Sequence, residues 1–291
     1  MRSKRNISVA IYLLLCSSLL CSSTVRAEAA KDGLCVSIFP RFSATDTVRM
    51  YSPIVDYLAN KLGRDVRLVT SRNFKTFWQA LSEGKCDIVH FNQYHYIKSH
   101  HKFGYEAILM NEEFGSATIA GSIIVRKDKG YKSLADLKNK NIVFGGGPRA
   151  MQSYIIATHL LRKAGLQEGD YNYEFTKNPP NAILAPYFGQ ADAGGVGDRV
   201  LELPVITRRI DTDKMTFLAR SEQLPHLPWA VINTMPEALA MRIQKILSSM
   251  TYSTDGREIL KKAALTGLRV AKDSDYDQHR LIIREVLGER Y

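Results

Sequence analysis

The feature that most constrains the fold is a regular alternation of β-rich runs and amphipathic helical patterns. In the first half of the chain, β-rich runs at 34–40, 65–71 and 86–91 are separated by helical patterns at 51–63 and 74–84. Each helical pattern is followed by a glycine, a common helix stop. A β-α-β-α-β order is typical of a parallel sheet with helices on its faces.

The alternation continues in the second half, which predicts a second lobe of the same kind. One local echo supports a duplicated plan: Gly84 precedes Asp87 by three residues, and Gly189 precedes Asp192 by three. The repeat is short, and coincidence stays an alternative. The strands and helices expected here follow the order strand 122–127, helix 133–140, strand 141–146, helix 150–165, strand 172–176, helix 181–189 and strand 191–195.

Two further β-rich runs, at 215–221 and 229–234, flank the segment "EQLPHLP". The prolines of this region predict a rigid crossover between the lobes. Three helical patterns follow, at 236–250, 257–265 and 276–288. The fold class expected is therefore α/β, with two lobes that are each a mostly parallel sheet flanked by helices.

The N-terminus reads as an export signal. Arg2, Lys4 and Arg5 precede an apolar stretch at 9–20, and small residues offer a cleavage site near Ala27. The stretch is shorter than the ~20 residues of a membrane span. A membrane anchor is the alternative for this segment. Lipidation at Cys16 or Cys21 is another alternative, although each follows a leucine where a lipobox needs a small residue.

The charge of the mature chain argues against nucleic acid as a partner. Four basic residues and no acids leave with residues 1–27, so the net charge falls from +11 to +7. The remaining Lys and Arg residues are scattered among acids, without a basic stripe interleaved with aromatics. A solvated basic surface explains this pattern, and it carries a mild bias towards anionic ligands.

A strand, three glycines, a proline and an arginine precede the helix at 150–165. Gly145, Gly147 and Ala150 match G-x-G-x-x-G/A, but the acidic residue of a dinucleotide site would be Glu174, which comes too late. A P-loop is excluded because no Lys-Ser/Thr pair follows. The loop predicts an anion site at a helix N-terminus, and a plain tight turn is the alternative. The candidates are Gly146, Gly147, Arg149, Ala150, Met151, Gln152 and Ser153.

The stretch "HFNQYHYIKSHH" at 90–101 suggests a metal at first sight. His90, His95 and His100 are five residues apart, so successive rings fall on different faces of a helix. No Asp, Glu or Cys nearby completes a zinc-like set, and no metal is expected. Ligand binding where a strand ends and a helix begins explains this stretch better. The candidates are His90, Phe91, Asn92 and Tyr94.

No nucleophile motif and no cofactor motif appear, so an enzyme is not expected and no cofactor is predicted. An exported enzyme on the same fold stays open as an alternative, since the absence of motifs does not exclude one.

The segments "PIVDYLANKLG", "FWQALSEGKCDIVHFNQYHY", "GSIIVRKDKGYKSLADLKNKNIVFGGGP" and "FLARSEQLPHLPWAV" resemble, in order and spacing, the phosphate/phosphite/phosphonate-type periplasmic binding proteins of ABC importers. The resemblance covers roughly residues 34–250. It implies a periplasmic, monomeric receptor that closes two lobes on a small ligand and serves an inner-membrane permease. Residues 28–118 would form the first part of lobe 1, 119–232 lobe 2, and 233–291 helices that return to lobe 1.

The resemblance also assigns ligand positions. Phosphonate binders of the family carry Ser-Thr-Ser-Gly where this chain has Ala150, Met151, Gln152 and Ser153, and aromatic cleft positions fall on Phe74 and Phe91. A ligand with an apolar part is therefore expected, and bare phosphate should bind worse than in relatives. In the second lobe Asn178, Asn181, Asp198 and Arg199 are expected near the cleft. The set is completed by Phe39, Arg41 and His226.

Cys35 and Cys86 open the first and third predicted strands, which are neighbours in a doubly wound sheet, about 4.8 Å apart. Because export permits oxidation, a disulfide is predicted, with two buried thiols as the alternative.

One further functional class stays open for the whole chain: a sensory module that presents its ligand to a membrane receptor. A neighbouring gene for a permease would indicate an importer component, whereas a neighbouring gene for a kinase or cyclase would indicate a sensory module.

Overall fold

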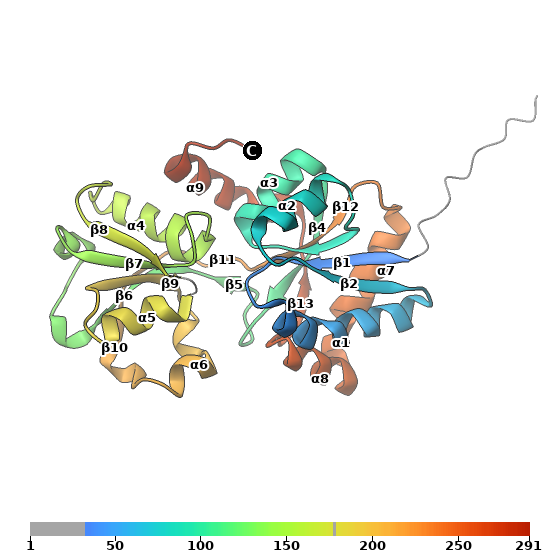
Figure 1. Cartoon of the computed structure of the whole chain (residues 1–291), viewed down its shortest axis with the longest axis horizontal. Helices are drawn as coiled ribbons and strands as arrows, with labels where there is room; N and C mark the ends of the chain where they lie inside the picture. The colour runs from blue at the N-terminus through green and yellow to red at the C-terminus, as the bar shows by residue number, and fades with distance from the viewer. Residues whose placement is uncertain (1–32, 177–178) are drawn as a thin grey trace, which may run out of the picture. The chain divides into compact units, whose positions relative to one another are not determined.

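The computed structural model describes residues 33–176 and 179–291 of the chain, and residues Gly33–Tyr291 form one compact unit. The predicted export signal at 1–27, with its cleavage site near Ala27, and Asn178 lie outside the described residues. Within the described residues the strands form a six-stranded sheet, a five-stranded sheet and a two-stranded ribbon (Figure 1).

The six-stranded sheet forms the centre of lobe 1. β1 runs parallel to β2 and β3, whereas β12 is antiparallel to β3 and β4, and β13 is antiparallel to β4. In spatial order its strands are β13 (Gly267–Val270), β4 (Tyr105–Glu112), β12 (Pro228–Ile232), β3 (Ile88–His90), β1 (Leu34–Ile38) and β2 (Val66–Thr70).

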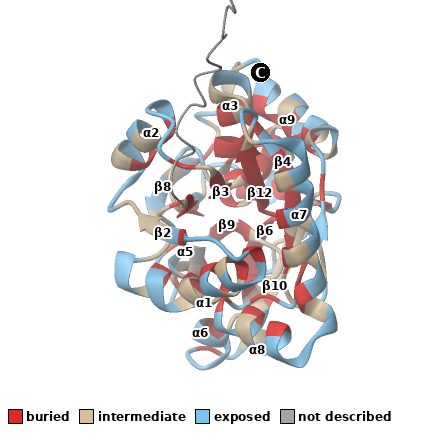
Figure 2. Cartoon of the chain, turned by 90° about the vertical axis from the view of Figure 1, so that its right-hand side faces the viewer, coloured by how far each residue is buried: buried red, intermediate tan, exposed pale blue. Residues whose placement is uncertain are grey.

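Helices cover both faces of this sheet and bury two apolar clusters (Figure 2). One face packs against α1 (Ala44–Leu62), α7 (Glu237–Ser248) and α8 (Thr254–Lys262). The other packs against α2 (Phe74–Ser82), α3 (Gln93–Phe103) and α9 (Asp277–Leu287). α1 begins at the N-cap Ser43, whose side chain accepts from the amide of Asp46, and ends at Gly63 in a left-handed conformation.

The five-stranded sheet forms the centre of lobe 2 and is also covered on both faces. α4 (Ala157–Lys163) packs on one face, and α5 (Pro179–Tyr187) with α6 (Pro204–Thr207) on the other. In spatial order the strands are β10 (Met215–Arg220), β6 (Gly121–Arg126), β9 (Ala193–Gly197), β7 (Asn141–Gly145) and β8 (Asn172–Thr176). Short 3-10 segments occupy Lys127–Lys129, Leu134–Leu137, Val200–Glu202, Thr212–Lys214, Ser249–Tyr252 and Asp273–Tyr276.

The chain crosses between the lobes twice, and the two crossings pair with each other. β5 (Thr118–Ile119) leads from β4 to β6, and β11 (Leu224–Pro225) leads from β10 back to β12. The two are antiparallel, with Leu224 opposite Ile119. The crossover predicted at "EQLPHLP" is therefore present as one strand of a hinge ribbon.

The two-lobed α/β fold class is confirmed: both sheets are mixed, with four of six strands in lobe 1 and four of five in lobe 2 running in the same direction. In lobe 2, β7 is parallel to β8 and β9, while β6 is antiparallel to β9 and β10. The strands that run against the βαβ strands beside them are β12 in lobe 1 and β6 in lobe 2, the two strands by which the chain enters each lobe from the hinge. The predicted lobe boundaries stay a prediction. One strand within the range predicted for lobe 2 (119–232), β12, lies in the sheet of lobe 1.

The cysteine-bearing segments lie side by side, since β1 and β3 pair directly. Cys35 and Cys86 are both buried, and no disulfide joins them in this structure. The thiol of Cys35 and burial together raise the pKa of the Cys86 thiol, so the thiolate that starts disulfide exchange is disfavoured in the folded state.

Candidate functional site

The glycine-rich loop begins where β7 ends. Gly146 has a left-handed φ of 92°, and a side chain at Gly147 would meet nothing within 4 Å, so the backbone faces open space there. The following helix starts as a π-helix, Met151–Ile156, before it becomes α4. Its first amides have no partner within the helix, as the anion-site prediction requires.

Side chains of this first helical turn are less available than the sequence suggested. Ser153 is 4% exposed, and its hydroxyl donates to the carbonyl of Gly145. Met151 is buried in the cluster that also contains Phe91. Gln152 keeps a buried Nε2 without a hydrogen-bond partner among the described residues, so its amide is a donor that a ligand could satisfy.

Arg149 faces lobe 1 and the C-terminal tail. Its Nε donates to the Tyr94 hydroxyl at 3.2 Å, and its NH2 lies 4.0 Å from Glu289. The Tyr94 hydroxyl donates to Glu289 at 2.7 Å, and Asn92 donates to the carbonyl of Arg149 at 3.3 Å. Burial, with the hydrogen bond to Glu289, raises the pKa of Tyr94. The loop is thus held against the carboxyl end of β3.

A second polar group lies beside the hinge ribbon, around a carboxylate that the sequence did not single out. Asn111 donates from Nδ2 to Glu113 at 3.0 Å and accepts from the Trp229 indole at 2.9 Å. Glu113 also lies 3.8 Å from Arg41 and 3.7 Å from Nε2 of His226. The Trp–Asn pair fixes the carboxylate, while its charged neighbours are too distant for strong hydrogen bonds.

His226 is 2% exposed and lies beside Glu113. The amide of Leu227 donates to its Nδ1 at 2.8 Å, so the neutral ring carries its proton on Nε2, towards Glu113. Burial lowers the pKa of His226, although Glu113 opposes the shift. The ring is therefore a neutral donor whose Nε2 has no hydrogen-bond partner among the described residues.

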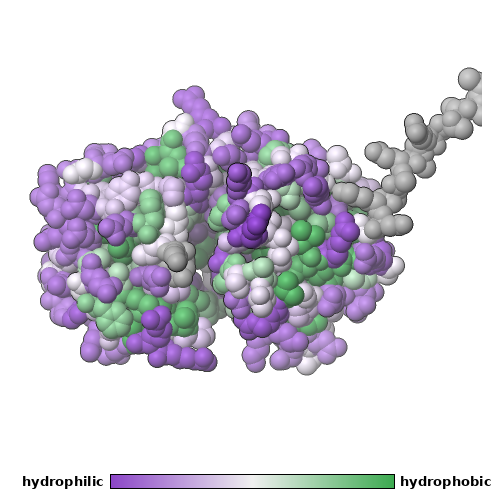
Figure 3. All heavy atoms as spheres, viewed as in Figure 1, coloured by the Kyte–Doolittle hydropathy of each residue, from purple (hydrophilic) through white to green (hydrophobic). Residues whose placement is uncertain are grey.

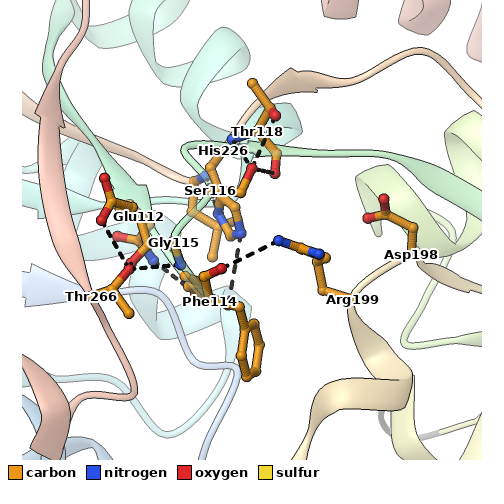
Figure 4. Close-up of polar contacts among 12 residues, drawn as sticks. Glu112, Phe114, Gly115, Ser116, Thr118, Asp198, Arg199, His226 and Thr266 are labelled. Carbon is orange, nitrogen blue, oxygen red and sulfur yellow. Dashed lines mark hydrogen bonds and ion pairs between the residues drawn. The ribbon is translucent and has the colours of Figure 1, made fainter.

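Lobe 2 reaches the same region through the residues that follow β9 (Figure 4). Asp198 accepts from the amide of Ala120 at 3.0 Å and from Gln223 at 2.7 Å. Arg199 pairs with Glu202 at 2.8 Å and donates to the carbonyl of Phe114 at 3.3 Å. Residues of both lobes and of the hinge therefore meet here.

Aromatic rings surround these polar groups on the lobe 1 side. Phe39 meets the buried His90 edge-on at 5.4 Å, and His90 stacks on Trp229 at 4.7 Å. Phe74 stacks on His95 at 4.5 Å. Burial lowers the pKa of His90 well below its ordinary value, so this ring is neutral. Lobe 1 therefore places the Arg41 guanidinium beside neutral rings, 5.8 Å from the centre of Phe39.

The structure brings some predicted residues together and separates others. Arg41 and His226 converge on Glu113, and Asn92, Tyr94 and Arg149 meet at the glycine loop. Phe91, Met151 and Ser153 are buried under the site rather than open to it. Asn181 is exposed in α5. The residues that sequence reasoning missed are Asn111, Glu113, Phe114 and Gln223. The only feature of the sequence that could have drawn attention to them is the pair of acidic residues in "NEEFG", and no helical or strand periodicity marks that pair as part of a site.

A groove separates the two lobes on the face shown in Figure 3. A separate depression of about 300 Å³ lies on lobe 2, lined by Lys127, Thr216 and Arg220 among others, and it includes none of the predicted residues. Within residues 33–176 and 179–291, no group of three or more His, Cys, Asp or Glu side chains is placed to hold a metal ion. The helices described are all too short or too polar to cross a bilayer.

Comparison with known proteins agrees with this architecture. PhnD1 from Prochlorococcus marinus, solved with methylphosphonate, superposes with a TM-score of 0.75 at 15% identity, over 89% of this chain and 99% of its own. A binding protein component of an ABC phosphonate transporter from Pseudomonas aeruginosa gives a TM-score of 0.72 at 13% identity, over 88% and 86%. A Xanthomonas citri protein bound to ATP gives 0.72 at 16% identity, over 88% and 98%.

These identities establish the shared fold alone, since one fold can serve many different ligands. The sequence profile of the family described as "ABC transporter, phosphonate, periplasmic substrate-binding protein" matches residues 36–276, most of the chain. The chain therefore belongs to the periplasmic substrate-binding proteins of phosphonate ABC transporters.

Proposed function

We propose that this protein binds a small phosphonate-like oxyanion between its two lobes and delivers it to an inner-membrane permease. The observation that carries the proposal is the meeting of polar groups from both lobes beside the hinge, where Arg199 of lobe 2 donates to Phe114 of lobe 1. A ligand bound at such a meeting point would favour the closed arrangement, because it contacts both lobes.

The anionic group of the ligand would face the glycine loop. The backbone there is open at Gly147, and the first helical amides point outwards with the positive helix end behind them. Arg41 supplies charge from lobe 1, since its partner Glu113 is 3.8 Å away. Arg149 already donates to Tyr94, so it would have to divide its guanidinium N–H groups between Tyr94 and the ligand.

The ligand would carry an apolar part beside that anionic group. Ala150 and Met151 stand where phosphonate binders of the family have hydroxyls, and rings such as Phe39 and Phe74 line lobe 1. At positions 150–152 this chain therefore lacks the hydroxyl donors that would bind the oxygens of bare phosphate. Methylphosphonate should therefore bind more tightly than inorganic phosphate.

The remaining parts of the proposal concern the setting. The protein would be a periplasmic monomer, released by cleavage near Ala27, without nucleic acid as a partner. A disulfide between Cys35 and Cys86 would form during oxidative folding, before β1 and β3 bury the two thiols. The pairing of β1 with β3 supports this, because it puts the two cysteines in one part of the core.

Calorimetry with methylphosphonate and with inorganic phosphate tests the proposal. We expect tighter binding of methylphosphonate and a smaller radius of gyration in solution scattering with the bound protein. Arg149→Ala should cost about 1.5–3 kcal/mol of affinity if Arg149 reaches the ligand through a charged hydrogen bond. No binding of either probe, with a neutral molecule recovered by mass spectrometry from periplasmic protein, would contradict the proposal.

A further inference from the structure

The link between β4 and β5 is a tight turn with an unusual residue at its tip. Glu113 and Ser116 exchange two backbone hydrogen bonds of 2.9 Å, which leaves Phe114 and Gly115 as the central pair. Their φ angles are 49° and 75°, both left-handed. Turns of this kind take Asn, Asp or Gly at the first central position, and a bulky aromatic residue there is strained.

The strain is not offset by burial of the ring in a core. Among the described residues, the four buried apolar clusters and the side chains packed against them do not include Phe114. Figure 4 shows the ring pointing away from Ser116 and Thr266, the residues that anchor the turn. A strained residue without a packing role is a candidate for a functional one.

The turn is held from three directions, so its tip is fixed in space. In lobe 1, Thr266 accepts from the amide of Gly115 at 3.0 Å. At the hinge, Glu113 faces His226, and from lobe 2, Arg199 donates to the carbonyl of Phe114 at 3.3 Å. The backbone of Phe114 is therefore fixed where the lobes meet, with Arg199 donating to its carbonyl and the neighbouring Glu113 lying 3.8 Å from Arg41.

We propose that Phe114 determines the specificity of the site, with its ring contacting the organic substituent of a phosphonate-like ligand whose charged end is bound by neighbouring donors. This inference rests on the proposed function and adds that the site distinguishes its ligands by their organic substituent. An aromatic wall favours an alkyl group over a hydroxyl, because the hydroxyl would lose its hydrogen bonds to water there.

The experiment compares Phe114→Gly, Phe114→Leu and wild type in calorimetry with inorganic phosphate, methylphosphonate and ethylphosphonate. Glycine accepts the left-handed conformation, so Phe114→Gly removes the ring without adding strain. We expect its affinity for the two alkylphosphonates to fall by about fourfold for each carbon that the ring contacts, with phosphate binding unchanged. Phe114→Leu, which keeps an apolar side chain, should retain most of the preference.

A matched control is Ala264→Gly, which relieves a left-handed residue (φ 58°) at an exposed position after α8. It should leave all three affinities unchanged. Both glycine variants should melt within about 2 °C of wild type or above it. A large fall in melting temperature for Phe114→Gly alone would mean that the ring serves packing, which overturns the proposal.

The outcomes separate the two proposals. If wild type binds the alkylphosphonates and Phe114→Gly keeps the same preference over phosphate, the specificity role is refuted while the proposed function stands. An equal loss for all three probes would also refute it, because the turn would then only position the site. If wild type binds none of the probes, the proposed function fails and the role of Phe114 fails with it.

Discussion

Buried histidines make the stability of this protein sensitive to mild acid. His95 is 3% exposed and His279 is fully buried, and burial lowers the pKa of each from 6.5 to about 3. Nearby cations act in the same direction, Lys98 and Arg149 on His95 and Arg280 on His279. The folded protein therefore keeps both rings neutral at pH values where the unfolded chain protonates them.

The sign and size of the effect follow from proton linkage. Below pH 6.5 the unfolded state binds more protons than the folded state, so the free energy of unfolding falls as the pH falls. One pH unit corresponds to about 1.36 kcal/mol per group, so each ring costs about 2 kcal/mol between pH 6.5 and 5.0. His90 and His226, whose pKa values are also lowered, add to the same trend.

The carboxylates contribute little to the change in stability between pH 6.5 and 5.0. The pKa values of Asp46, Asp136 and Asp273 lie below 3.8, because hydrogen bonds to the carboxylate form outweigh burial. A lowered carboxyl pKa contributes stability that is lost only as the pH falls below the unfolded value. The change between pH 6.5 and 5.0 therefore reports the histidines.

Urea unfolding at pH 7.0 and 5.0 measures the effect in wild type, His279→Leu and His101→Gln. Leucine fills a similar volume and removes a ring whose two nitrogens lack hydrogen-bond partners among the described residues. We expect His279→Leu to lose about 2 kcal/mol less than wild type on acidification. His101, exposed at the end of α3, should behave as wild type. An equal loss in wild type and His279→Leu would refute the reasoning.

Much of the fold could be predicted from the sequence because its elements follow simple periodic patterns. The strands at β1, β2, β3, β6, β7 and β9 carry apolar runs, and each was expected close to its observed position. β4 was missed. It contains Asn111 and Glu112, polar residues that are rare in buried strands. Tertiary partners satisfy them, Trp229 for Asn111 and Thr266 for Glu112, and no local pattern reveals such partners.

The site was predictable only in part, and the reason is sequence distance. Carboxyl ends of strands locate Phe39, Arg41 and Asn92 by a general rule. The contacts that assemble the site join residues 85 positions apart, as for Arg199 and Phe114, or 57 apart, as for Asn92 and Arg149. The turn at Phe114 also contradicts local preference, so a sequence rule would place another residue type there. Sites that combine strain with long-range contacts need the structure.

Two predictions concern the core. Gly195→Ala should destabilise by about 3 kcal/mol, since its Cβ would lie 2.3 Å from Phe144 and from the carbonyl of Ser153 and a shift of about 1 Å is needed. Gly147→Ala, with open space around it, is the matched control in thermal melts; equal melting temperatures would contradict the close packing. For Cys35 and Cys86, thiol titration of denatured, unreduced periplasmic protein should find no thiol. The bridge would stabilise by about 4 kcal/mol in the chain-entropy model, so reduction should lower the melting temperature by roughly 8 °C or more. Two reactive thiols in the unreduced protein would refute the disulfide. They would show that the two cysteines stay reduced when buried, in line with the raised pKa of the Cys86 thiol in the folded state.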